Sequence, residues 1–305
     1  MGFDLQRRVR GTHAAAGGYV HHPGRGTGAQ RPRDRRDRIH RRAALCAERW
    51  VADITVFARA VVVYIEYQSR GDMEPQPWLF DELAHAGGEH LDPTYVATYD
   101  TKAQTDPSDD LAVLLQLGLD HRSTLVDFGA GTGTFTLAAA RVCRRVVAVD
   151  VSAAMLHQLH ESARALDLAN IECAQSGFLT YEHQGELADF AYSRNALHHL
   201  PDFWKALALR RVARTLKSGR ILYLRDLVFS CSLQETDAII ESWLAGAPIR
   251  AADGFTASEL ATHVRDEYST YSWLLEPMLE RAGFEIRNAA YSPSQVFAAF
   301  TCVKP

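Results

Sequence analysis

The spacing of hydrophobic residues changes repeatedly along the chain after residue 120. Short apolar runs of strand length alternate with longer segments in which apolar residues recur every three to four positions, as on an amphipathic helix. This pattern predicts strands over 124–128, 145–150, 171–174, 188–193 and 220–227, and helices over 134–142, 152–166 and 201–216. Such alternation is typical of βαβ units and a parallel sheet.

The segments that flank this alternation differ from it. Before it, 77–85 and 93–99 are predicted to form short helices, and a third helix is expected to begin near Ser108. After it, 284–290 and 295–303 read as an antiparallel hairpin. Residues 229–283 interrupt the alternation with helical, aromatic-rich sequence, which we interpret as an insertion.

Composition places the chain among ordinary soluble globular proteins, with 305 residues, 47% hydrophobic and 23% charged. The longest apolar run, 50–67, contains charges and falls short of the roughly 20 apolar residues that a spanning helix needs. No secretory signal is recognised at the N-terminus. The five cysteines lack metal-binding or redox spacing. We therefore predict a cytoplasmic protein with reduced thiols, no membrane partner and no metal site.

The charge is distributed unevenly. Residues 1–72 hold 14 Arg and 7 acidic residues, a net charge of +7, whereas 73–305 holds 19 basic and 30 acidic residues, a net charge of -11. The first segment, rich in Arg, Gly, Ala and His, is predicted to be a disordered extension that either binds acidic partners or has no function of its own. Residues 73–305 form the predicted folded domain, whose negative charge disfavours nucleic acid as a partner.

A glycine-rich turn follows the strand predicted over 124–128. In V-D-F-G-A-G-T-G, Gly129, Gly131 and Gly133 allow a sharp turn and close approach of a ligand, at the sheet edge where ligands of open α/β sheets bind. The third glycine comes one residue earlier than in the dinucleotide fingerprint. Asp127 occupies a position that a strand buried on both faces would leave apolar, and its carboxylate suits an ammonium group or a set of N–H donors.

An acidic residue ends the next predicted strand. Asp150 is placed to accept hydrogen bonds from a ribose diol, as the equivalent acid does in dinucleotide-binding folds. Its alternative role is to cap the following helix, but Ser152 is available as that cap.

Four motifs in this order resemble those of the class I S-adenosylmethionine-dependent methyltransferases, over about residues 95–305. They are V-D-F-G-A-G-T-G, V-V-A-V-D-V-S-A-A-M-L, A-D-F-A-Y-S-R-N-A-L-H-H-L-P-D and L-K-S-G-R-I-L-Y-L-R-D. The resemblance implies a doubly wound, Rossmann-like α/β fold with a seven-stranded sheet, mostly parallel with an antiparallel C-terminal hairpin strand. It also implies S-adenosyl-L-methionine as cofactor and a small-molecule methyl acceptor. The oligomeric state stays open.

The resemblance also implies roles for individual residues. The methionine end would be held by Asp127, Gly129, Ala130 and Gly131, the ribose by Asp150 and one adenine face by Val151, with Asn195 near the amino group and sulfonium. One departure stands out, because the family often has an acid for the adenine amino group in a stretch like G-D-F-L. Here the stretch is S-G-F-L, and Gly177 replaces the acid, leaving backbone groups or Ser176 for recognition and Phe178 for packing.

The residues that perform the transfer are harder to predict. Displacement at an activated methyl mainly requires alignment, with a base only if the acceptor keeps its proton. His198 and His199 are candidate bases, of which one is expected to point into the site, unless L-H-H-L-P is only a structural junction. The insertion at 229–283 is assigned to the acceptor side, where Tyr268 and Tyr271 would share a helical face and form a lid.

Strand 220–227 ends in two charged residues. Of Arg225 and Asp226, one is expected to line the acceptor site and the other to be a surface pair. Two other functions stay open: a nicotinamide-dependent oxidoreductase, disfavoured by the glycine spacing, and a catalytically inactive cofactor-binding protein, favoured by the change at Gly177.

Overall fold

A computed structural model describes residues 6–8, 65–66 and 76–305 of the chain. Within the predicted N-terminal extension it contains two short strands, β1 (Gln6–Arg8) and β2 (Ile65–Glu66). The rest of the segment predicted to be disordered lies outside the described residues.

The central sheet has the topology that the sequence predicts. Its strand order is β1-β9-β10-β7-β6-β3-β4-β5-β2. The seven longer strands are β3 (Thr124–Phe128), β4 (Arg145–Asp150), β5 (Ile171–Gln175), β6 (Ala188–Arg194), β7 (Leu216–Phe229), β9 (Glu285–Tyr291) and β10 (Phe297–Val303). Strands β3 to β7 pair in parallel, whereas β10 runs antiparallel to both β7 and β9. The expected mostly parallel sheet with an antiparallel C-terminal hairpin is confirmed.

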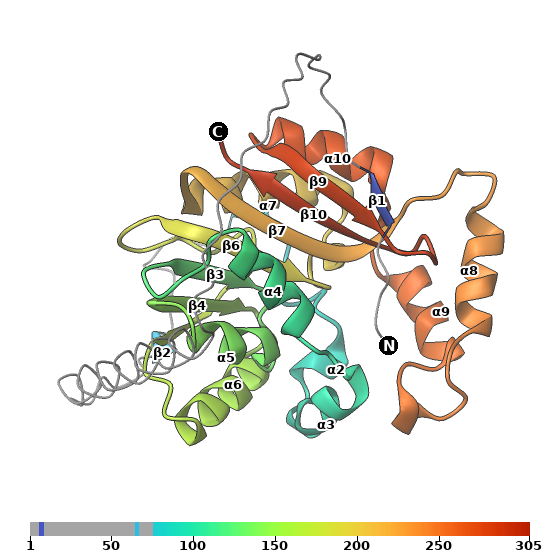
Figure 1. Cartoon of the computed structure of the whole chain (residues 1–305). Helices are drawn as coiled ribbons and strands as arrows, with labels where there is room; N and C mark the ends of the chain where they lie inside the picture. Colours follow the sequence, from blue (N-terminus) through green and yellow to red (C-terminus); the bar gives the residue numbers. More distant parts are fainter. Residues whose placement is uncertain (1–5, 9–64, 67–75) are drawn as a thin grey trace, which may run out of the picture. The chain divides into compact units, whose positions relative to one another are not determined.

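Helices cover both faces of this sheet. They are α2 (Gly88–Leu91), α3 (Pro93–Ala103), α4 (Ser108–Gln116), α5 (Thr134–Ala140), α6 (Ala153–Ala165), α7 (Asp202–Thr215), α8 (Thr236–Ala245), α9 (Ala257–Asp266) and α10 (Ser272–Arg281). Adjacent strand residues face opposite layers, so Leu125 packs with α4, α5 and α6, and Val126 packs with α7 and α10. Figure 1 shows α4, α5 and α6 together on one side of the sheet.

One predicted helix is absent. Residues 77–85 form successive turns, closed by bonds such as Leu79 N–H to Gln76 O at 2.9 Å, rather than a helix. Distant partners hold this segment: Phe80 packs against Trp204, and the Glu82 carboxylate accepts the N–H of Leu179. These tertiary contacts outweigh the local helical preference, and they bring Glu82 to the sheet edge.

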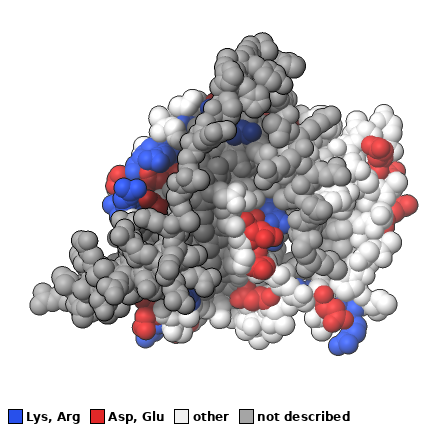
Figure 2. All heavy atoms as spheres, viewed as in Figure 1, with Lys and Arg blue, Asp and Glu red and all other residues white. Residues whose placement is uncertain are grey.

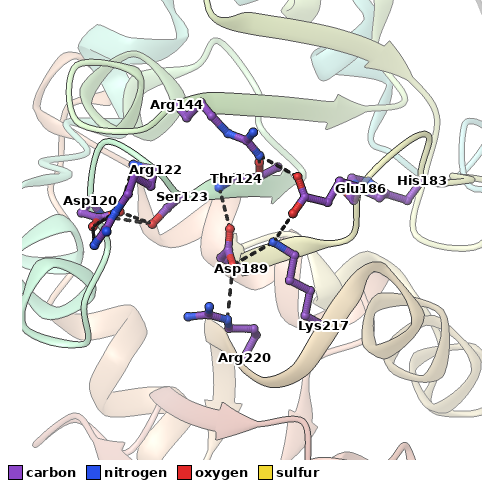
Figure 3. A network of polar contacts seen from close by, with 10 residues as sticks. All are labelled: Asp120, Arg122, Ser123, Thr124, Arg144, His183, Glu186, Asp189, Lys217 and Arg220. Atoms are coloured by element: carbon purple, nitrogen blue, oxygen red, sulfur yellow. Dashed lines mark hydrogen bonds and ion pairs between the residues drawn. The ribbon is translucent and has the colours of Figure 1, made fainter.

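Charged residues join the amino ends of three strands, as Figure 3 shows. Asp189 accepts the Thr124 N–H at 3.0 Å and contacts Lys217 at 3.1 Å, while Glu186 pairs with both Lys217 and Arg144. This network fixes β3, β6 and β7 at the edge opposite their carboxyl ends. The carboxyl ends are therefore the edge available for a ligand.

Two other sequence-based expectations concern sulfur chemistry and membranes. Cys143, Cys173, Cys231 and Cys302 are buried and form no disulfide with one another, while Cys46 lies outside the described residues. Among the helices that the structure describes, none is long and apolar enough to cross a membrane.

Candidate cofactor site

A cavity lies at the carboxyl ends of β3, β4, β5 and β6. The space between its atoms is about 740 Å³, which includes space open to solvent. Four strand ends and the segment before α4 contribute to its wall. The lining residues are Glu82, Ala86, His90, Tyr99, Gly129, Gly131, Asp150, Val151, Ser152, Met155, Ser176, Gly177, Phe178, Asn195, Ala196, His199 and Leu200.

The glycine-rich turn reaches the cavity through two of its three glycines. Gly129 has φ +72°, and a Cβ there would lie 2.2 Å from the Cβ of Ala196. Gly131 has φ +56°, faces open space, and donates its N–H to the Asp150 carboxylate at 2.8 Å. Gly133 packs instead against Leu159, where a Cβ would come within 2.4 Å of the side chain. Neither Gly133 nor Ala130 lines the cavity.

Asp127 lies behind the turn, not in the cavity wall. It is buried with 2% exposure and accepts a hydrogen bond from the Thr136 hydroxyl at 2.6 Å. Burial raises the pKa of this carboxyl to about 7, against the opposing effect of the Thr136 bond. The side chain thus links β3 to α5, the two elements that the glycine-rich turn connects.

Stability should depend on the ionisation of Asp127. Its pKa is raised from an ordinary 3.8, so between about pH 4 and pH 7 the unfolded chain releases a proton that the folded chain keeps. The contribution of this group to the free energy of unfolding therefore falls as pH rises through that window. Between pH 5 and pH 7, the free energy of unfolding in urea should fall for the wild type by about 1–2 kcal/mol more than for Asp127→Asn, which cannot titrate. Equal losses in both proteins would contradict this assignment.

Asp150 ends β4 with its carboxylate at the cavity wall. One oxygen accepts the Ser152 N–H at 2.8 Å, and the other accepts the Gly131 N–H. Burial outweighs these bonds and raises the pKa of the carboxyl. Ser152 caps α6 by accepting the Met155 N–H at 3.2 Å. Asp150 is therefore not needed as the side-chain cap that the sequence left as an alternative.

A second carboxylate in the cavity wall was not predicted from the sequence. Glu82 comes from the segment of turns before α2 and accepts the Leu179 N–H at 3.0 Å. Its carboxylate lies where a side chain at Gly177 would extend, because a Cβ at Gly177 would come within 2.3–2.4 Å of the carboxylate atoms. Burial raises the pKa of Glu82 to about 7. No local motif marks Glu82, so only the folded chain identifies it.

Two aromatic residues on the short helices α2 and α3 complete this side of the cavity. The His90 ring lies 5.5 Å from that of Tyr99 and 5.9 Å from that of His199, and the His90 carbonyl accepts the Ser152 hydroxyl at 2.7 Å. Burial raises the pKa of Tyr99 to about 12, so its hydroxyl stays protonated. Residues 82–99, which precede the alternating strands and helices, thus form part of the cavity wall, a role that their sequence did not indicate.

The two adjacent histidines on the 3-10 turn η1 (Leu197–His199) point to different surroundings. His199 lines the cavity, and burial together with His198 lowers its pKa to about 3. His198 is buried, and its Nδ1 lies 2.5 Å from Asp226 and its Nε2 lies 3.0 Å from Glu267. Burial would lower the pKa of His198, but the two carboxylates raise it to about 9. Only His199 is available at the wall, consistent with one histidine pointing in.

The predicted tyrosine lid has a different geometry. Tyr268 and Tyr271 do not share a helical face, because α9 ends at Asp266 and β8 (Thr270–Tyr271) pairs with β7. The Tyr268 N–H donates to the His198 carbonyl at 2.9 Å, and the Tyr271 hydroxyl lies 2.6 Å from Thr236. Neither tyrosine lines the cavity. A spacing of three residues brings two side chains to one face only in a helix, and the chain is not helical between Tyr268 and Tyr271.

The two charged residues in β7 separate to opposite faces. Asp226 contacts His198, whereas Arg225 is buried against Asp110 of α4 at 2.9 Å. Arg225 is therefore neither a cavity residue nor part of a surface pair. Alternation along a strand explains the separation, because neighbouring side chains point to opposite layers.

Comparisons with known proteins agree with this arrangement. Residues 125–219 match the family described as "Methyltransferase domain". An uncharacterized methyltransferase from Bacillus thuringiensis is 24% identical over 208 residues, which cover 68% of this chain and 89% of that protein. The 23S rRNA (uracil(1939)-C(5))-methyltransferase RlmD from Alcanivorax borkumensis is 30% identical over 113 residues, 36% of this chain. The match spans only 24% of the length of RlmD.

Solved structures with the same fold include a putative methyltransferase from Bacillus halodurans, with a TM-score of 0.50 and 18% identity, covering 65% of this chain and 99% of that one. A SAM-dependent methyltransferase from Aquifex aeolicus also has a TM-score of 0.50, with 19% identity, 70% of this chain covered and 99% of that one. Residues 125–219 therefore form a methyltransferase domain, and the strand order and the glycine turn agree with the class I S-adenosylmethionine-dependent methyltransferases.

Proposed function

We propose that this protein transfers a methyl group from S-adenosyl-L-methionine to a small-molecule acceptor by in-line displacement. The observation that carries the proposal is the cavity at the carboxyl edge, where the glycine turn and Asp150 meet in one wall. When bound, the cofactor supplies a methyl group activated by a positively charged sulfur. The protein therefore has to bind, align and exclude water.

The cavity wall carries groups that suit such a cofactor. Gly129 and Gly131 leave backbone surface free of side chains, and Asp150 presents a carboxylate for the ribose hydroxyls, next to Val151 for an adenine face. Asn195 follows β6 and also lines the cavity, and the resemblance places the amino group and sulfonium near it. Asp127 supports this site indirectly, through the turn and α5.

Glu82 compensates for the acid missing at Gly177. Its carboxylate occupies the space of a side chain at 177 and lines the cavity together with Phe178. We assign it as the acceptor for the adenine amino group, supplied by a segment outside the matched domain region 125–219.

Replacing Glu82 should weaken cofactor binding. Glu82→Gln removes a charged acceptor, and calorimetry with S-adenosylhomocysteine should show roughly tenfold weaker binding, about 1.5 kcal/mol. Gly177→Asp placed in a Glu82→Ala background should recover much of the affinity, because removing the Glu82 side chain frees the space for the new carboxylate. The exposed Glu241 gives a matched control as Glu241→Gln. Unchanged affinity in Glu82→Gln would remove Glu82 from the adenine site.

The acceptor end is assigned to the part of the wall near His199 and Leu200. We propose His199 as the catalytic residue that faces the acceptor. His198, the other candidate, is buried outside the cavity wall, so its proposed role is to position His199, with Asp226 orienting its own ring. A small acceptor is supported by the cover that α2 and α3 place over the cavity and by the net charge of -11 over 73–305. On the face in Figure 2, the described Lys and Arg side chains lie beside Asp and Glu rather than in one basic field.

The function is tested first at the cofactor. Calorimetry should detect S-adenosylmethionine and S-adenosylhomocysteine at one site per chain and should show no binding of NADH. Turnover is then followed as S-adenosylhomocysteine released with a panel of small hydroxyl, amine, carboxylate and thiol acceptors. Cofactor binding without turnover on that panel, but with methylation of RNA, would overturn the small-molecule acceptor. NADH binding in place of the sulfonium nucleoside would overturn the methyltransferase function.

A further inference from the structure

Four ionisable side chains meet beside the cavity, and one of them, His198, precedes the cavity residue His199 in the chain. They come from separate elements: His198 from η1, Asp226 from β7, His263 from α9, and Glu267 from the residue that follows α9. The Nε2 of His198 lies 3.0 Å from a carboxylate oxygen of Glu267, and the Nδ1 of His263 contacts the same oxygen. One ligand atom from each of His198, His263 and Glu267 lies within 4.8 Å of the others.

The other nitrogen of each histidine is held by a fixed partner. His198 Nδ1 lies 2.5 Å from the Asp226 carboxylate, and His263 Nε2 lies 2.9 Å from the Ser269 hydroxyl. Metal-binding histidines characteristically use their second nitrogen in this way, which fixes the tautomer and the orientation of the ring. In neutral rings with those nitrogens protonated, the two inward nitrogens direct lone pairs at the Glu267 carboxylate, so an ion bound there displaces the inward proton that His198 carries in its ion pair with Glu267.

This convergence requires a positive charge at its centre. The inward Glu267 oxygen is buried, and although both inward histidine nitrogens lie within ion-pair distance of it, no hydrogen bond of ordinary geometry reaches it in the described structure. Electron-pair donors that face one another without a cation repel, and burial adds a desolvation cost for the carboxylate. A proton satisfies one pair of these atoms, whereas a metal ion satisfies all three.

We propose that His198, His263 and Glu267 bind a divalent transition-metal ion such as Zn²⁺, with Asp226 and Ser269 orienting the two imidazoles. Two nitrogens and one carboxylate oxygen suit Zn²⁺, and three protein ligands leave one position of a tetrahedral ion open. The ion links the turn after β6 to the insertion at 229–283. The proposal does not depend on which cofactor or acceptor binds in the cavity, although His198 takes part in both proposals.

Metal binding is measured on the full chain after chelator treatment and dialysis, with Co²⁺ as the optical probe and Zn²⁺ as its competitor. The wild type should bind one Co²⁺ per chain with the visible bands of a tetrahedral ion, and Zn²⁺ should raise its melting temperature. Binding should weaken at least tenfold in His263→Ala and Glu267→Gln. His157→Ala, which removes an exposed histidine of α6, should bind as the wild type does.

Two outcomes would overturn the site. Equal Co²⁺ affinity in His263→Ala, Glu267→Gln and the wild type would place any bound metal elsewhere in this histidine-containing chain, and an absence of saturable binding would leave the cluster as a protonated hydrogen-bond network. X-ray absorption of the Zn²⁺-loaded wild type needs no variant. Two imidazole ligands per Zn²⁺ are expected, and none or one would exclude this coordination. Failure of cofactor binding in the same preparation would bear on the proposed function only.

Discussion

Asp110→Ala should lower the free energy of unfolding by about 3–5 kcal/mol, because it removes a buried carboxylate that pairs with two guanidinium groups. Asp110 lies in the first turn of α4 with 1% exposure. It pairs with Arg225 at 2.9 Å and Arg194 at 3.0 Å, and it accepts the Tyr192 hydroxyl at 2.8 Å. A single carboxylate thus holds α4 to the carboxyl ends of β6 and β7.

The neighbouring residue provides the control. Asp109 occupies the same helical turn but is exposed, so Asp109→Ala should change stability by no more than about 0.5 kcal/mol. Asp110→Asn, which keeps the shape and loses the charge, should fall between the two. Urea unfolding at pH 7 gives all three values, with the slope m checked for constancy. A loss below 1 kcal/mol in Asp110→Ala would mean that water replaces the carboxylate.

The second large effect is expected at Asp150. Asp150→Asn replaces a carboxylate that faces the cavity by an amide that cannot accept hydrogen bonds through both of its terminal atoms. Each charged hydrogen bond lost to the ribose should weaken S-adenosylhomocysteine binding by about 1.5–3 kcal/mol, or roughly 10- to 150-fold. Calorimetry measures the affinity directly.

Asp150 also holds the turn, so its two roles have to be separated. It accepts the N–H groups of Gly131 and Ser152, and the variant loses part of these contacts. Thermal unfolding without ligand reports that structural part. Asp167→Asn is a suitable control, because Asp167 is exposed and has φ +54°, a conformation that Asn tolerates. Affinity within twofold of the wild type in Asp150→Asn would exclude the ribose assignment.

Much of the sheet could be predicted because each of its strands is marked by a short local pattern in the sequence. The strands over 124–128 and 145–150 have the predicted ends, since buried parallel strands are continuous apolar runs bounded by turn residues. The parts of the site that follow these strands, Gly129, Gly131 and Asp150, line the cavity for the same reason. A residue at the carboxyl end of a parallel strand reaches the ligand edge in any such sheet.

Predictions that depended on an assumed period or on distant partners were less successful. Tyr268 and Tyr271 were placed on a helix, but β8 pairs with β7 and extends the chain there. Arg225 was expected at the surface or in the acceptor site, but Asp110, distant in sequence, buries it. Glu82 carries no motif, and its position depends on the Leu179 N–H and on the space left by Gly177.

The order of the main strands, the glycine turn and the acid that ends β4 can be predicted from the amino-acid sequence, because each is encoded within a few neighbouring residues. Which carboxylates and imidazoles meet depends on how distant segments pack. Glu82 reaches Gly177, and His198 reaches Glu267, through contacts between segments far apart in the chain. Such pairings arise from packing and burial of the whole domain, which no local pattern specifies.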